Sequence, residues 1–293
     1  MSFRITPLID PSPPAASRRL VFLALDASGF PVGSASLRLF TSAGQKHLAE
    51  LDMNVHPVDR RLGIGSQLLE ATVARAKEEH RRSVVAQADA GSPGDAFLAA
   101  RGFRRVLTLT FARLPLPHVD CDALAGQLEE PRPGYRLLSW LGGVPDELAE
   151  DFAASRSAMD DMPMDGTDYG TVAWDADRVR AAAGVIGERG DLLRTVAVVD
   201  EVSNRIVGFT ELVVPGDGRG DAQHYGTGVL PEHRGRGLGR WMKAESIRQA
   251  RADHPGLGGL LTDTAESNTP MRRINDALGY APTHRAFEYQ LDL

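Results

Sequence analysis

The strongest chemical signal in the sequence is a short glycine turn, Arg234-Gly235-Arg236-Gly237-Leu238-Gly239, which follows an apolar strand pattern and opens a helical one. Consecutive backbone N–H groups in such a turn point into one concavity, and the helix N-terminus adds partial positive charge. Glycine lets the backbone approach a ligand closely, and two arginines add charge nearby. The turn therefore predicts an anion-binding site, for which a pyrophosphate is the natural ligand.

The turn occurs twice, and the first copy, Arg60-Arg61-Leu62-Gly63-Ile64-Gly65, lies in the first half of the chain. Each copy follows a predicted strand, opens a predicted helix, and is followed by a Gly-aromatic pair, Gly102-Phe103 or Gly279-Tyr280. The Arg-x-x-Gly-x-Gly spacing alone is a weak motif, but its repetition in matching context is informative. We expect the second copy to bind a ligand. For the first copy, a sharp turn without a ligand explains the pattern equally well.

These residues resemble the GNAT superfamily of acyl-coenzyme A N-acyltransferases. That signature is a strand, Gln/Arg-x-x-Gly-x-Gly/Ala, a helix, another strand, an Asn-led helix and Gly-Phe. The resemblance covers most of residues 135–293 and, more loosely, residues 1–113. The tandem layout is similar to that of mycothiol synthase and related actinobacterial two-domain proteins. Stretches such as Leu230-Pro231-Glu232 and Ser267-Asn268 are closer to those relatives than to mycothiol synthase itself.

The resemblance implies that acetyl-CoA is the co-substrate, without a metal, and that the donor site lies in the second half. Backbone groups of Val229 and Leu230 would meet the pantetheine arm and the thioester, and Asn268 would lie beside the arm. The pyrophosphate would be held by the turn, through Arg234, Gly235, Arg236, Gly237, Leu238, Gly239 and Arg240.

The catalytic groups that the resemblance implies are only partly present. Many members place a tyrosine, as the acid for the leaving thiolate, at the position of Asn275, whose amide can donate a hydrogen bond to sulfur but no proton. Some members use a glutamate where Gln223 stands. Glu211, on the preceding predicted strand, is the first candidate for the base. Tyr225, two positions beyond Gln223 on the same strand face, is the second. A solvated strand carboxylate explains Glu211 equally well, and Asp263 and Glu266 rank lower.

The elements that must position these groups give an α/β fold of layered α+β type, with two GNAT-like domains. Each domain is predicted as a central mixed β-sheet flanked by helices. We expect a degenerate domain at residues 1–115, a proline-punctuated linker at 116–133, and a complete, active domain at 134–293. We expect the first domain to lack the first two helices of the fold. The segment between its first two predicted strands, residues 10–17, is too short and too rich in proline to form them.

Composition limits the remaining possibilities. The net charge of −6 and the lack of a basic block argue against a nucleic-acid partner, and no apolar run is long enough to span a membrane. Cys121 is the only cysteine, which excludes an intrachain disulfide and a cysteine metal cluster. The N-terminus lacks a secretory pattern, so we expect a cytoplasmic protein, either a monomer or a homodimer.

The predicted function is transfer of an acetyl group to a primary amine of a small molecule, by direct attack on the thioester. Four acidic residues between Asp160 and Asp168 suit a cationic amine, although a solvated acidic loop is the commoner meaning of such a pattern. Two alternatives stay open at this point. One is a non-catalytic acyl-CoA sensor or scaffold, and the other is an N-acetyltransferase acting on proteins or peptides.

Overall fold

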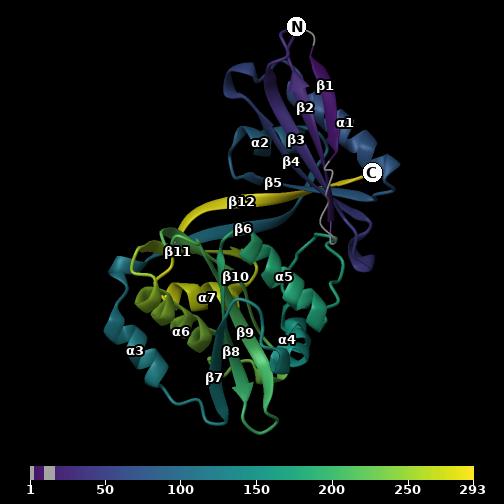
Figure 1. Ribbon diagram of the computed structural model, residues 1–293. Helices are drawn as coiled ribbons and strands as arrows, with labels where there is room; N and C mark the ends of the chain where they lie inside the picture. Colours follow the sequence, from purple (N-terminus) through teal and green to yellow (C-terminus); the bar gives the residue numbers. More distant parts are fainter. Residues whose placement is uncertain (1–2, 10–16) are drawn as a thin grey trace. The chain divides into compact units, whose positions relative to one another are not determined.

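The computed structural model describes residues 3–9 and 17–293, and the chain divides into two compact units (Figure 1). The first unit contains the described residues up to Thr108 together with residues 164–172 and 285–293. The second contains residues 109–163 and 173–284. Segments 164–172 and 285–293 thus belong to the first unit although they lie in the second half of the sequence. The predicted domain boundaries at residues 115 and 134 stay a prediction.

Among the described residues, the first unit has a sheet with the strand order β1-β2-β3-β4-β5-β12, in which only β4 and β5 run parallel. Alternate residues of these strands, such as Leu37 and Ala86, are buried against the apolar side of the long helix that follows the first glycine turn. The strands are β1 (Arg4–Ile9), β2 (Ser17–Leu25), β3 (Pro31–Phe40), β4 (Leu48–Val55), β5 (Ser83–Asp89) and β12 (Ala281–Asp292), and the helices are α1 (Ile64–Glu78) and α2 (Pro93–Ala100).

The second unit has a sheet with the order β6-β11-β10-β9-β8-β7, and of its described strands only β10 and β11 run parallel. Its strands are β6 (Arg104–Pro115), β7 (Tyr135–Leu141), β8 (Leu192–Asp200), β9 (Arg205–Val214), β10 (Gly220–Val229) and β11 (Leu257–Ala265). Its helices are α3 (Cys121–Glu129), α4 (Ala149–Ser155), α5 (Ala176–Glu188), α6 (Leu238–Asp253) and α7 (Thr269–Ala277). The mixed α/β fold with two GNAT-like halves is confirmed.

Helices cover both faces of the second sheet, as Figure 1 shows. On one face, α4 and α5 pack on β8 and β9 around Phe152 and Phe209. On the other face, α6 and α7 pack on β9, β10 and β11 around Ile247 and Leu260, with Leu278 beside α7. Long apolar runs in β8 and β9 reflect this burial from both sides, because neither face of these central strands meets solvent.

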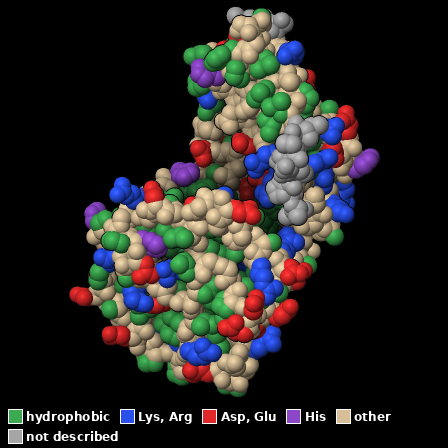
Figure 2. All heavy atoms as spheres, in the orientation of Figure 1, with side chains coloured by type: hydrophobic (Ala, Val, Ile, Leu, Met, Phe, Trp, Pro, Cys, Tyr) green, Lys and Arg blue, Asp and Glu red, His purple; other side chains and the backbone are tan. Residues whose placement is uncertain are grey.

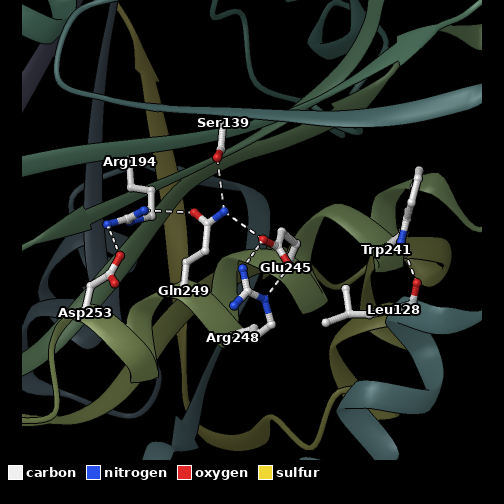
Figure 3. A network of polar contacts seen from close by, with 8 residues as sticks. All are labelled: Leu128, Ser139, Arg194, Trp241, Glu245, Arg248, Gln249 and Asp253. Atoms are coloured by element: carbon white, nitrogen blue, oxygen red, sulfur yellow. Dashed lines mark hydrogen bonds and ion pairs between the residues drawn. The ribbon is translucent and has the colours of Figure 1, made fainter.

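A network of polar contacts fixes α6 on the sheet (Figure 3). The Arg194 guanidinium, from β8, donates to Gln249 Oε1 at 2.9 Å and to Asp253 Oδ2 at 2.6 Å. The Gln249 amide in turn donates to Ser139 Oγ of β7 and to Glu245 one turn earlier. Because α6 opens at the glycine turn, this network also sets the position of the predicted donor site.

The segment predicted as a linker, 116–133, folds as part of the second unit. Leu116 and Leu124 are buried in the core beneath α6, and Asp120 caps α3 by accepting a hydrogen bond from the Ala123 amide. The indole of Trp241 on α6 donates to the Leu128 carbonyl at 3.4 Å (Figure 3). The segment is therefore packed against the helix that the glycine turn opens.

No helix among the described residues is long and apolar enough to cross a membrane. On the face shown in Figure 2, acidic and basic side chains of the described residues are interspersed over each unit. Within the described part of the chain, no cluster of histidine, cysteine and carboxylate side chains has the arrangement of a metal site.

Candidate active site

The site begins where two parallel strands stop pairing. Strand β10 pairs with β11 only from Gly220 to Gln223, although β10 continues to Val229 and β11 to Ala265. Directly after the last residue that pairs with β11, the register of β10 against β9 shifts between His224 and Gly226. The backbone groups of β10 beyond Gln223 on its β11 side are therefore not used in pairing with that strand, and they can hydrogen-bond an extended ligand.

The glycine turn follows directly at the end of β10. After the 3₁₀ turn Pro231–His233, Gly235 and Gly237 adopt φ of 76° and 73°, in the left-handed region that favours glycine. Helix α6 then begins with Gly237 as its N-cap and with no side chain capping it. Its first N–H groups thus lack partners within the helix, and they lie where the sequence predicts an anion site.

The third glycine of the turn serves packing rather than backbone conformation. A Cβ added to Gly239 would lie 3.3 Å from the Ile274 Cδ1 atom of α7. Glycine at this position therefore lets α6 and α7 approach each other closely next to the turn.

The arginines of the turn already have partners within the chain. The Arg234 guanidinium binds both carboxylate oxygens of Asp161 at 2.5 and 2.7 Å and also donates to the carbonyls of Val229 and Ala158. Arg240 lies 3.5 Å from the carboxylate of Glu130. Arg234 thus links the turn to the segment after α4, and the N–H groups remain the preformed part of the predicted phosphate site.

Arg132 is a cation beside the turn that the sequence reasoning missed. Its side chain is 7% exposed, and its Nε atom has no hydrogen-bond partner among the described residues. That Nε atom lies 3.3 Å from where a Cβ of Gly237 would stand. A buried donor without a partner beside an anion site is a ready ligand for a phosphate oxygen. The only signal in the sequence was its place between two prolines, which indicated a linker.

The two asparagines of the predicted site, Asn268 and Asn275, lie at opposite ends of α7. Asn268 caps the helix, because its Oδ1 accepts the Met271 amide at 3.2 Å, which leaves its Nδ2 for a ligand. Asn275 is buried, and its Nδ2 donates to Thr264 Oγ1 at 3.1 Å. Its Oδ1 accepts a hydrogen bond from the ammonium of Lys243 at 2.7 Å. The sequence reasoning did not single out this lysine.

Glu211 is buried in an ion pair. Its Oε2 atom accepts from Arg156 Nη1 at 2.7 Å, and the guanidinium lies over the rings of Phe152, Trp174 and Phe209 at 4.2–5.3 Å. The two side chains are only 7% and 11% exposed. Glu211 therefore holds the segment after α4 against β9. Its role as a base stays a prediction, and this pairing gives it a structural task as well.

Tyr225 lies in the bulge of β10, so the alternation that placed it beside Gln223 is interrupted there. Its side chain is 51% exposed, and its hydroxyl accepts a hydrogen bond from Arg189 at 3.1 Å. His224, the residue between them, is buried and hydrogen-bonded to the Tyr280 hydroxyl at 2.8 Å. Gln223 donates to Asp263 at 3.3 Å. The carboxylate beside Gln223 is therefore that of Asp263, whose pKa is raised by burial.

The predicted acidic loop is divided between ion pairs rather than gathered at one site. Asp161 binds Arg234, as described above, whereas Asp168 lies 3.3 Å from His47 and belongs to the first unit. Residues 164–172, which belong to the first unit, pack on the face of its sheet opposite α1, where Tyr169 contacts Phe40. Beside it is a hollow of about 560 Å³ lined by charged strand residues.

The first glycine turn reproduces the backbone of the second. Arg60 Nε donates to the Val55 carbonyl at 3.2 Å, as Arg234 Nε does to Val229 at 2.7 Å. Gly63 has a φ of 88° and caps α1, but Arg61 stands where the second turn has Gly235, and its φ of 67° is unfavourable for a side chain. The first unit keeps this conformation at a cost of about 1–2 kcal/mol.

A strand pair that separates before a glycine turn and helix, in each case within a mixed sheet, defines an acyltransferase fold of the GNAT type. The chain belongs to the acetyltransferase (GNAT) family, whose model matches residues 7–103 and 161–280. The chain is thus an N-acetyltransferase with two repeats of the family's fold.

Individual relatives agree with this tandem arrangement. The chain is 28% identical over 260 residues to a mycothiol acetyltransferase of Stackebrandtia nassauensis, covering 87% of this chain and 77% of that protein. It is 30% identical over 251 residues to that of Thermobifida fusca, covering 82% and 72%. A tandem GNAT protein from the clavulanic acid biosynthesis pathway superimposes with a TM-score of 0.77 at 25% identity, covering 96% of this chain and 84% of that one.

Proposed function

We propose that the second unit binds acetyl-CoA and transfers the acetyl group to a primary amine of a small molecule. The observation that carries this proposal is the separation of β10 from β11 directly before an uncapped helix N-terminus. The helix N-terminus suits the pyrophosphate, and the free edge of β10 suits the amide groups of the pantetheine arm. Arg132 and the backbone of residues 235–240 would bind the phosphates. Val229, Leu230 and Asn268 would line the arm.

In this mechanism the neutral amine attacks the thioester carbonyl, and a backbone N–H of β10 stabilises the oxyanion. The carbon–sulfur bond then breaks, its electron pair stays on sulfur, and the amine nitrogen loses its proton to water. The similarity to mycothiol acetyltransferases supports a small-molecule acceptor over a protein substrate.

A matched pair of glycine variants tests which unit carries the site. Gly237→Ala and Gly63→Ala change corresponding N-cap residues of α6 and α1, both with positive φ. We expect Gly237→Ala to weaken acetyl-CoA binding at least about 10-fold and to abolish thiol release, because an alanine there strains the turn and crowds Arg132. Gly63→Ala carries the same strain and should leave thiol release unchanged. Equal losses in both variants would contradict the assignment to the second unit.

The assay is calorimetric titration with acetyl-CoA, followed by release of free thiol with a panel of primary amines. It should be run on a Cys121→Ser chain, because Cys121 is an exposed free thiol that reacts with the same reagents. A non-catalytic acyl-CoA sensor is the second candidate function. It is favoured by the ion pairing of Glu211, and it predicts binding without thiol release from any amine.

A further inference from the structure

A lysine is buried in the second unit next to the proposed thioester end of the site. Lys243, on α6, is 1% exposed and donates to Asn275 Oδ1 of α7 at 2.7 Å. Its ammonium also lies 4.8 Å from the centre of the Tyr280 ring. Fully buried lysines are rare because removing an ammonium from water is costly, so this one is expected to have a function.

Lys243 is the group of this cluster whose charge changes near neutral pH. Burial lowers the pKa of Lys243 to about 7, against the opposing attraction of Asp263 on β11. Burial, together with the charge of Lys243, holds the pKa of His224 on β10 well below its usual range. Burial raises the pKa of Tyr280 far above neutrality. Burial raises the pKa of the Asp263 carboxyl, whereas Thr264 of β11 and Asn275 of α7, which also line the cluster, do not titrate.

The hydrogen bonds of the cluster determine the orientation of the Asn275 amide. The Lys243 ammonium is a donor only, so it must face the oxygen of the amide. The amide nitrogen then faces Thr264, which accepts one of its two N–H groups at 3.1 Å. One N–H is left over, and the adjacent ammonium polarises the amide so that this N–H becomes a stronger donor.

We propose that Lys243 is a positioning residue that turns an Asn275 N–H toward the thioester sulfur and supplies the positive charge that stabilises the departing thiolate. This inference rests on the proposed function, since it requires acetyl-CoA at the second glycine turn. As the carbon–sulfur bond breaks, the electron pair moves onto sulfur and is stabilised there by the N–H and the nearby charge. The thiolate leaves as an anion and takes its proton from water, so neither Asn275 nor Lys243 gives up a proton.

The test measures the ionisation of the thiol of CoA bound to the full chain. The ultraviolet absorbance of the thiolate reports this ionisation as the pH is changed. The Cys121→Ser background removes the chain's own thiol. A free thiol has a pKa of about 8.5. The thiolate and the Lys243 ammonium stabilise each other and titrate as a coupled pair, so we expect binding to lower the pKa of the CoA thiol by about 1 unit and to keep Lys243 charged to a higher pH than in the free chain.

Lys243→Met removes the charge while keeping a long apolar side chain, and it should abolish this shift of the thiol pKa. Lys77→Met, on the exposed face of α1, is the matched control and should leave the shift intact. Lys243→Gln is a second variant in case the first does not fold. It keeps an N–H donor for Asn275 but no charge, so it should bind CoA normally and lose most of the shift.

The outcomes separate this inference from the proposed function. If CoA binds and its thiol has the same pKa in the wild-type chain and in the Lys243 variants, the role of Lys243 is wrong while the donor site stands. If the wild-type chain does not bind CoA, the donor site itself is wrong and the inference falls with it. Loss of the shift in both Lys243 variants, but not in Lys77→Met, supports the role of Lys243 and the donor site together.

Discussion

The buried pair of Arg156 and Glu211 permits a test of whether Glu211 acts in structure or in catalysis. Removing either partner leaves a buried charge without its counter-ion, which typically costs about 3–5 kcal/mol. Both side chains are nearly inaccessible, so little of this cost is relieved by solvent. We therefore expect Arg156→Met and Glu211→Met each to lose about 3–5 kcal/mol of unfolding free energy. For a unit of this size that lowers Tm by about 6–20 °C.

The double variant Arg156→Met/Glu211→Met should be closer to the wild-type chain than either single variant. It has no buried charge at this position and loses mainly the contacts of the guanidinium with three aromatic rings, which we estimate at about 1–2 kcal/mol in total. The resulting coupling energy should exceed about 2 kcal/mol. Tryptophan fluorescence is a suitable probe, because the chain's three tryptophans, Trp140, Trp174 and Trp241, all lie in the second unit.

Turnover per folded molecule then decides the role of Glu211. General base catalysis contributes about 10²–10⁴-fold, so a base would show a loss of that size in Glu211→Gln under conditions where the variant is folded. We expect a loss below about 10-fold, comparable to that of Arg156→Met. A loss near 10³-fold in Glu211→Gln, with Arg156→Met nearly unaffected, would refute the structural role. Additive stability losses in the double variant would refute the coupling.

Three further predictions concern the residues around the two glycine turns and the buried lysine. Arg132→Gln should weaken acetyl-CoA binding about 10-fold by calorimetry, whereas Arg136→Gln, which removes only an exposed contact with Asn204, should not. Because the pKa of Lys243 in the folded chain is about 7, below its unfolded value, the buried lysine destabilises the fold increasingly as pH falls from about 10.5 to 7. Lys243→Met should therefore be more stable than the wild-type chain at pH 7, by on the order of 4 kcal/mol, and this advantage should vanish near pH 10 in thermal denaturation. Arg61→Gly should stabilise the first unit by about 0.5–1 kcal/mol in calorimetric unfolding, because it relieves a positive φ.

The elements and the glycine turn could be predicted because their signals are local. Strand β4 alternates apolar and polar residues, and β9 is a nearly continuous apolar run, and both patterns are typical of strands. Asp175 is an aspartate of the type that caps helices, and its side chain accepts the Arg178 amide at 2.8 Å at the start of α5. Caps, turns and strand alternation depend on neighbours within a few residues, which are visible in the sequence.

The contacts that complete the site could not be predicted in this way. Lys243 meets Asn275 from 32 positions away, and Arg156 meets Glu211 from 55 positions away. Nothing in the sequence around Lys243 or Arg156 indicates that its side chain is buried, because a charged residue in a helix normally faces solvent. The bulge at Tyr225 also has no local signal apart from a following glycine, and it interrupts the alternation from which the strand face was inferred.

Taken together, these contacts predict how the rate depends on pH. Glu211 and Tyr225 both contact an arginine, and the pKa of His224 is held well below neutrality, so none of these three is a ready proton acceptor. Unless the lower-ranked Asp263 or Glu266 accepts the proton, the reaction requires an acceptor amine that has already lost its proton in solution. For two primary amines whose ammonium pKa values differ by about 2 units, the rising limb of kcat/KM against pH should shift by the same amount. If the limb stays at one pH for both amines, a group of the protein acts as the base, and the transfer cannot depend only on fixed N–H donors and the charge of Lys243.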